Sequence, residues 1–126
     1  MGLVARKAAA AGGKKLLLTE RGTTFGYNNL VVDMRSLAIL RQFGYPVIFD
    51  ATHSVQSPGS AGDHSGGEAD MAPVLARAAV AVGCDGIFLE THPQPSRARS
   101  DAETMLPLSS LPTLYETLRA LHRLAK

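Results

Sequence analysis

The chain has 126 residues, of which 45% are hydrophobic and 19% charged, with a formal net charge of +2. This length suits one domain with a modest core, and the composition is that of a globular chain. The small charge and the scattered basic residues argue against nucleic acid as a partner. We find no apolar run near the ~20 residues that span a bilayer and no signal peptide, so we expect a cytoplasmic protein without a membrane partner. The single cysteine, Cys84, excludes an internal disulfide and is expected to be buried.

The hydrophobic pattern predicts one helix followed by three strand–helix units. The first helix covers about residues 3–11 and ends at two glycines. The three apolar runs that favour strands are residues 15–19, 47–50 and 86–90. The helices that follow them are residues 33–43, 69–82 and 111–124. The connections are long enough for crossovers, so the strands should be parallel and the fold class α/β.

The second of these helices, at residues 69–82, shows apolar side chains at helical spacing. Its expected buried face consists of Met71, Val74, Leu75, Ala78 and Val82. We therefore expect these side chains to lie on one face of the helix.

Polar residues follow each of the three strands: Glu20 and Arg21, then Asp50 and His53, then Glu90 and His92. Ligands and chemistry in α/β proteins gather at this carboxyl end of the strands. Three successive units of this kind indicate a slice of a TIM (βα)₈ barrel, which normally needs ~200 residues or more. The chain is then either part of a longer protein or completed by other chains.

One imidazole and two carboxylates form the first candidate site: His53, Glu90 and Asp101. Nitrogen and oxygen ligands of this kind suit a divalent transition metal. Only the barrel arrangement would bring them together, because their spacing is no local motif. The alternative is that His53 is an ordinary polar loop residue and Asp101 a surface charge.

Arg21 and Asp50 are the next candidates. An arginine at a strand end can bind a phosphate or carboxylate with two hydrogen bonds, but Arg21 could equally form an ion pair with Glu20 or Asp50. Asp50 could orient His53 or bind substrate hydroxyls, or it could cap the following turn. The glycine-rich segment at 54–67 has the composition of a mobile lid.

Three runs carry a family resemblance: RGTTFGYNNLVVDMR at 21–35, VIFDATHSVQ at 47–56 and AAVAVGCDGIFLETHP at 78–93. They closely resemble the 3-deoxy-8-phosphooctulonate synthases, also called KDO-8-phosphate synthases. The resemblance implies that residues 1–126 are the carboxyl-terminal segment of that barrel, its last three βα units (strands 6–8). The related DAHP synthases share the strand ends but differ after Arg21, so they are the second choice.

The resemblance implies condensation of phosphoenolpyruvate with arabinose 5-phosphate, with release of phosphate, in the biosynthesis of KDO for lipopolysaccharide. It places Arg21, Asp50 and Asn28 among the substrate-binding residues, with Arg21 on the phosphoenolpyruvate phosphate. It makes His53, Glu90 and Asp101 the ligands of a divalent metal such as zinc, iron or manganese. His53 and Asp101 are also the candidate catalytic groups, since an imidazole or a carboxylate can move the proton.

The residues around Asp101 read Ser100-Asp101-Ala102, which resembles the metal-dependent form of the family, whereas metal-independent members carry Cys-Asp-Gly. The family's fourth ligand is a cysteine on a strand absent from this chain, and its substrate-binding lysines are absent too. We therefore expect the chain alone to be inactive. The family is typically tetrameric, which implies a homo-oligomer, and a non-catalytic fragment that self-associates is the alternative from another class.

Overall fold

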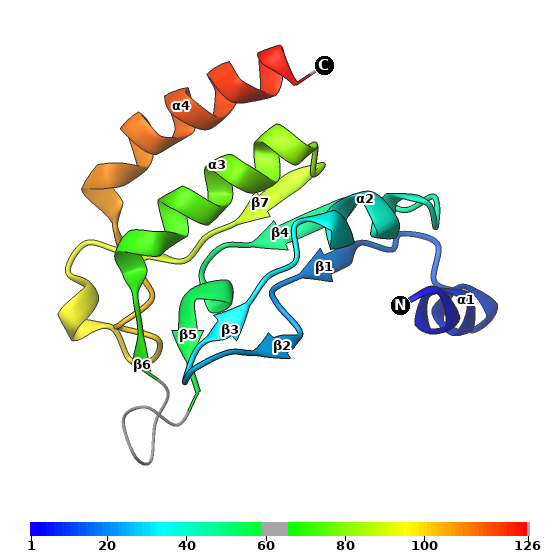
Figure 1. Ribbon diagram of the computed structural model, residues 1–126, viewed down its shortest axis with the longest axis horizontal. Helices are drawn as coiled ribbons and strands as arrows, with labels where there is room; N and C mark the ends of the chain where they lie inside the picture. The colour runs from blue at the N-terminus through cyan, green and yellow to red at the C-terminus, as the bar shows by residue number, and fades with distance from the viewer. Residues whose placement is uncertain (59–65, 126) are drawn as a thin grey trace.

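The computed structural model describes residues 1–58 and 66–125. Its main sheet contains three parallel strands, β1 (Leu18–Glu20), β4 (Val47–Asp50) and β7 (Gly86–Phe88), in the order β1-β4-β7 (Figure 1). Chain order and spatial order are thus the same, as expected when each strand is joined to the next by a crossover. The predicted parallel α/β arrangement is confirmed for these three strands.

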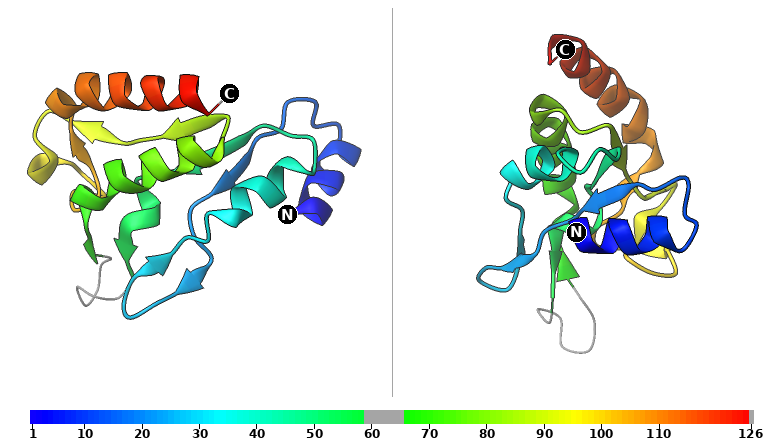
Figure 2. Two further views of the ribbon diagram at one scale, coloured as in Figure 1. Left: turned by 45° about the horizontal axis from the view of Figure 1, so that its top comes forward. Right: turned by 90° about the vertical axis from the view of Figure 1, so that its right-hand side faces the viewer.

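Four α-helices accompany the sheet: α1 (Gly2–Ala10), α2 (Arg35–Arg41), α3 (Ala72–Val82) and α4 (Leu111–Leu124). Helix α2 contacts β1 and β4, α3 packs on α2 and β7, and α4 packs along α3 (Figure 2). The α1 helix lies apart from these three, at the blue end of the chain in Figure 1. The core forms mainly between the sheet and the layer of α2 and α3, and Ala5 of α1 and Leu114 of α4 are buried in the same cluster.

Alternation along the strands explains why the core forms on this side. Leu18 lies opposite Val47 and both are buried, while Phe49 lies opposite Glu20 and is fully buried. Leu37 of α2 is also fully buried in the same cluster. Side chains at alternate positions, including Thr19 and Ile48, face away from this core and keep some solvent exposure.

Short strand pairs and 3₁₀ turns connect the main elements. The pairs are β2 (Thr24–Phe25) with β3 (Leu30–Val31), β5 (Gln56–Ser57) with β6 (Gly66–Gly67), and β8 (Thr91–His92) with β9 (Leu106–Pro107). The turns are η1 (His53–Val55), η2 (Ala69–Met71), η3 (Pro95–Arg97) and η4 (Leu108–Ser110). Most of these short elements lie in the loops that follow the carboxyl ends of the main strands, where the candidate site is.

Several of the sequence predictions need correction. The third strand is Gly86–Phe88 rather than residues 86–90, because Phe88 is the last residue that pairs with β4. The first strand is Leu18–Glu20 rather than residues 15–19, because pairing begins where Leu18 meets Val47, and Leu17 is 63% exposed. The run of three leucines is apolar throughout, so hydrophobicity alone does not indicate the residue at which pairing with the next strand begins.

The buried face of α3 also differs from the expectation, although Leu75 of the expected set is partly buried against the core. Met71, Val74 and Val82 are each more than 40% exposed. The buried residues of the helix are its small ones, with Val80 beside them: Ala72, Ala76, Ala79 and Val80. Small side chains let α3 lie close to the neighbouring elements, and a helix that is apolar nearly all round has no single face that its periodicity selects.

Half of the glycine-rich segment expected to act as a lid, residues 59–65, lies outside the described residues, which resume at Gly66. Its described ends, β5 and β6, pair antiparallel, with Gln56 opposite Gly67. Among the helices that the structure describes, none has the length and apolar character needed to cross a membrane.

Candidate metal centre

Asp50 is the last residue of β4 and holds the turn that follows it. Its Oδ1 accepts hydrogen bonds from the backbone N–H of Thr52 (3.1 Å) and of His53 (2.9 Å). Its Oδ2 lies 2.7 Å from Nδ1 of His53. Asp50 is 8% exposed, so these contacts are largely shielded from water. Of the roles left open for it by the sequence, capping the turn and orienting His53 are both present.

The contact with Asp50 decides which ring nitrogen of His53 is available. An ionised carboxylate only accepts hydrogen bonds, so beside it Nδ1 carries the hydrogen, and in the neutral imidazole Nε2 then keeps its lone pair. That Nε2 atom lies 3.7 Å from Oε1 of Glu90. The ring also stacks on Phe88, with centroids 5.9 Å apart and planes 22° apart. His53 is thus presented with Nε2 toward Glu90.

Glu90 is fixed through its backbone to the end of the neighbouring strand. Its N–H donates to the hydroxyl of Thr52 at 2.7 Å, and Thr52 is fully buried. Its carbonyl accepts from the N–H of Leu106 at 3.2 Å. The first bond continues the contact between β4 and β7 beyond their last ladder pair, and the second ties Glu90 to the chain that returns from the long loop.

Asp101 reaches the site from that loop rather than from a strand. Its backbone has φ of +52°, in the left-handed region that Asp tolerates better than most residues. Its carbonyl accepts from the backbone N–H groups of Thr104 and Met105, both at 3.0 Å, which closes a tight turn. Because β9 pairs with β8 directly after this turn, Asp101 is carried back to the end of β7.

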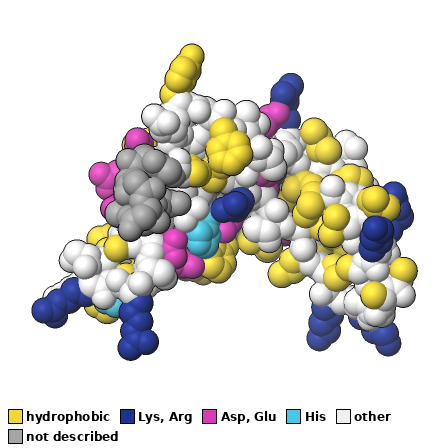
Figure 3. Space-filling model, turned by 90° about the horizontal axis from the view of Figure 1, so that it is seen from below, with side chains coloured by type: hydrophobic (Ala, Val, Ile, Leu, Met, Phe, Trp, Pro, Cys, Tyr) yellow, Lys and Arg dark blue, Asp and Glu magenta, His cyan; other side chains and the backbone are white. Residues whose placement is uncertain are grey.

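The three predicted ligands lie together: one ligand atom from each of His53, Glu90 and Asp101 falls within 4.8 Å of the others. We call these residues the triad. Figure 3 shows histidine and acidic side chains gathered on one face beside a basic side chain. One imidazole nitrogen and two carboxylates fit a divalent transition metal, and Asp50 behind the imidazole is a common outer-shell partner of metal-bound histidines. The donor set therefore fits a metal.

Arg21 extends from the end of β1 and is exposed. Within the described part of the chain it forms no ion pair with Glu20 or Asp50, so those two alternatives are wrong. Glu20 instead accepts a hydrogen bond from the N–H of Gly22 at 2.5 Å. The guanidinium Nη1 of Arg21 donates to Oε1 of Gln56 at 3.5 Å.

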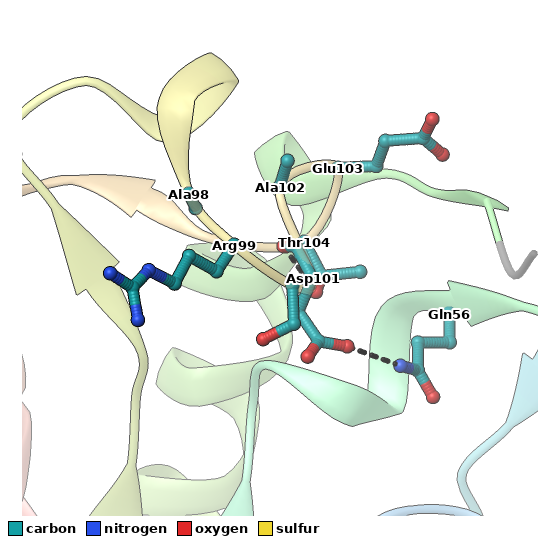
Figure 4. Close-up of a pocket in the computed structure, with 8 residues that line it drawn as sticks. Gln56, Ala98, Arg99, Asp101, Ala102, Glu103 and Thr104 are labelled. Carbon is teal, nitrogen blue, oxygen red and sulfur yellow. Dashed lines mark hydrogen bonds between the residues drawn. The ribbon is translucent and has the colours of Figure 1, made fainter.

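The sequence places Thr52 in the polar cluster after β4 and Gln56 at the start of the glycine-rich segment, but it assigns neither a role in holding the triad. Gln56 donates from Nε2 to Oδ1 of Asp101 at 3.1 Å, so it connects two candidates (Figure 4). Both residues lie within the run VIFDATHSVQ, but neither a buried threonine nor a polar glutamine carries a spacing signal of its own. Only their partners across the sheet and loop reveal them.

Asn28 stays a prediction as a substrate-binding residue. It lies in the turn between β2 and β3, is exposed, and has φ of +63°. Elsewhere, Nδ1 of His92 accepts from the N–H of Gln94 at 3.0 Å, which is a turn contact. Cys84 is 5% exposed, as expected.

These features define an α/β chain with a candidate metal centre at the carboxyl ends of parallel strands. A comparison with family models places it further: the DAHP synthetase I family matches over residues 1–126, and the chain belongs to that family.

Curated relatives agree with the resemblance seen in the sequence. The chain is 56% identical over 123 residues to the 2-dehydro-3-deoxyphosphooctonate aldolase of Dichelobacter nodosus, covering 98% of this chain and 44% of the relative. It is 57% identical over 126 residues to the protein of that name from Magnetococcus marinus, covering 100% and 44%. The protein of that name from Coxiella burnetii (strain RSA 493) is 57% identical over 123 residues, covering 98% and 44%. The chain thus spans less than half the length of these relatives.

Proposed function

We propose that this chain supplies the last three βα units of a metal-dependent KDO-8-phosphate synthase barrel. The carrying observation is the triad, which forms at the ends of parallel strands in a chain 56–57% identical to relatives named 2-dehydro-3-deoxyphosphooctonate aldolase. The order β1-β4-β7 is that of consecutive strands in a (βα)₈ barrel. The strand-end location also matches the place where such barrels carry out chemistry.

The reaction of the whole enzyme is the condensation of phosphoenolpyruvate, arabinose 5-phosphate and water to give KDO-8-phosphate and phosphate. His53, Glu90 and Asp101 would hold a divalent ion, which when bound supplies Lewis-acid polarisation of an aldehyde or a water. Arg21 binds the phosphate of phosphoenolpyruvate, since a guanidinium stabilises phosphate charge with paired hydrogen bonds. Asp50 and Asn28 contribute to substrate binding.

Proton movement is assigned to the imidazole of His53 and the carboxylate of Asp101. Carbon 3 of phosphoenolpyruvate attacks the aldehyde while water adds at carbon 2, so the aldehyde oxygen gains a proton and the water loses one. Both side chains lie at the triad, and Asp50 holds His53 in one tautomer. Because Nδ1 carries its hydrogen toward Asp50 and Nε2 is the ligand atom, His53 would take part in proton transfer only while Nε2 is not bound to the ion.

The metal part of the proposal is tested on the chain itself. Titration with Co²⁺, followed by visible absorption, should show one bound ion per chain, and His53→Ala should abolish the signal. A matched control is His122→Ala, since His122 is exposed on α4. Binding that survives His53→Ala unchanged would contradict the triad as the metal site.

The catalytic part needs the remaining strands. We expect no synthase activity from the 126 residues alone, and activity from a fusion that places the amino-terminal portion of the Dichelobacter nodosus relative before this chain. The measurement is phosphate release that depends on both phosphoenolpyruvate and arabinose 5-phosphate. A folded, metal-loaded fusion without such release would rule the proposal out, and release only with a shorter aldose phosphate would favour the DAHP-type alternative.

A further inference from the structure

Gln56 bridges the arginine and the triad. Its amide nitrogen donates to Oδ1 of Asp101 at 3.1 Å, and its amide oxygen accepts from Nη1 of Arg21 at 3.5 Å. Gln56 is partly buried at the first residue of β5, one turn after His53. The two ends of one amide thus contact a proposed phosphate-binding group and a proposed metal ligand.

The two hydrogen bonds of Gln56 require a side chain that accepts at one end and donates at the other, as an amide does. A guanidinium only donates hydrogen bonds and a carboxylate only accepts them, so a side chain between Arg21 and Asp101 must accept at one end and donate at the other. A carboxylate in place of Gln56 would repel Asp101, and an ammonium group would repel Arg21. The two neighbours therefore also fix which way round the amide lies.

Asp101 is the triad member that most needs such support. Its backbone is held by the turn to Thr104 and Met105, but its carboxylate faces an open pocket of about 500 Å³ lined by Gln56 and residues 98–104. In Figure 4 the side chain of Arg99 points away from Asp101, whereas Gln56 points toward it. Among the described residues, Gln56 is the side chain that hydrogen-bonds this carboxylate.

We propose that Gln56 is a positioning residue: it holds the Asp101 carboxylate toward His53 and Glu90, and Arg21 sets the orientation of its amide. Metal affinity then depends on Gln56, and the effect of Arg21 on metal affinity passes through Gln56. The inference rests on the metal role proposed for the triad, but it needs no catalytic activity to be tested.

The first experiment measures Co²⁺ affinity of the chain by competition with a chromogenic chelator. Gln56→Met keeps the side-chain length and removes both hydrogen bonds. We expect binding to weaken about tenfold, the lower end of the effect of removing an outer-shell partner, with a changed visible band because one ligand is displaced. Gln42→Met is the matched control, since Gln42 is exposed just after α2, and it should change affinity less than about twofold.

A double-mutant cycle with Arg21→Met tests the second half of the proposal. Removing a cation near the triad favours metal binding through charge alone, in any background. With Gln56 present, Arg21→Met also removes the hydrogen bond that orients the Gln56 amide. Asp101 is then held less well, which lowers metal affinity and opposes that gain. The gain should therefore be larger, by about threefold, in the Gln56→Met background than in the unchanged chain.

The possible results separate this inference from the proposed function. If Co²⁺ binds, His53→Ala abolishes binding and Gln56→Met leaves it unchanged, the inference is overturned and the metal site stands. If the unchanged chain binds no Co²⁺, both fall. Two further results would also overturn the inference, because each would leave Gln56 without a positioning role. One is a fall in the thermal midpoint of Gln56→Met that is large enough to explain the lost binding by unfolding. The other is an effect of Arg21→Met on Co²⁺ affinity that is the same with and without Gln56.

Discussion

The two ends of the three-stranded sheet use their polar groups differently. At the amino ends, the N–H of Val47 donates to Oδ2 of Asp85 and the N–H of Asp85 donates back to the carbonyl of Val47, both at 2.8 Å. At the carboxyl ends, Asp50 and Thr52 bind backbone groups in the same way, but they serve to present His53 and Glu90. At the amino ends the polar groups bind one another, whereas at the carboxyl ends three possible ligand atoms lie within 4.8 Å of one another.

This difference agrees with the general division of labour in parallel α/β folds, where the amino ends stabilise and the carboxyl ends bind. It predicts that changes at the two ends have separable effects. Variants at the carboxyl ends should reduce metal affinity with little loss of stability, and variants at the amino ends should do the reverse.

Asp50→Asn should have the largest effect. The amide oxygen can still cap the turn at Thr52 and His53, but its NH₂ group can then donate to Nδ1 of His53, which moves the ring hydrogen to Nε2 and blocks metal ligation. We expect Co²⁺ affinity to fall roughly ten- to a hundredfold, as measured by chelator competition.

Asp70→Asn is the control for that variant, because Asp70 is exposed in η2. A similar loss in both variants would show that the effect is one of general charge. An Asp50→Asn chain that bound metal normally would break the proposed distinction between the two ends.

Asp85→Ala tests the amino ends. The substitution leaves the N–H of Val47 without its charge-assisted partner at the start of the central strand. We expect a loss of about 1.5 kcal/mol in the free energy of unfolding, measured in urea, with Co²⁺ affinity unchanged. Asp70→Ala should lose less than about 0.5 kcal/mol. Weaker metal binding by folded Asp85→Ala would show that the two ends are coupled.

The smallest expected effect concerns Cys84, which also lies at the amino end of the sheet. This effect is a dependence of the free energy of unfolding on pH. Burial raises the pKa of its thiol above the ordinary value. The unfolded chain therefore ionises first as pH rises, so the native state binds more protons there and stability falls with increasing pH above the unfolded pKa.

The comparison that isolates this effect is the unchanged chain against Cys84→Ala, in urea titrations between pH 7 and 10. The free energy of unfolding of the unchanged chain should fall relative to Cys84→Ala in the upper part of that range. A difference that stays constant with pH would mean that the thiol does not titrate differently on folding.

Much of the fold could be predicted because it depends on local patterns. Apolar runs with β-branched residues predicted the strands β4 and β7, and the lengths of the connections predicted that these strands are parallel. The predicted strand start and the predicted buried helix face were wrong where several neighbouring residues are equally apolar. Leu16, Leu17 and Leu18 are equally apolar, and pairing with Val47 selects Leu18 as the start of β1. Helix α3 is apolar nearly all round, and close packing selects its alanines.

The candidate site was predictable in its members but not in its supports. A histidine and acidic residues after strands are visible in the sequence, and the family resemblance assigned them to a metal. The roles of Thr52 and Gln56 were not visible, because their partners, Glu90 and Asp101, are 38 and 45 residues away. A hydroxyl or amide has a role only once a partner is within hydrogen-bonding distance.

The sequence by itself determined the parallel α/β class, the order of the strand–helix units and the family, since these follow from periodicity and from long specific runs. Tertiary structure decided which nitrogen of His53 is free, through Asp50, and how Asp101 reaches the site, through the pairing of β8 with β9. The physical reason is that ligand geometry depends on which atoms the folded backbone brings within reach, in the turn that joins Asp50 to His53 and in the pairing that returns Asp101, and the sequence pattern does not specify those contacts.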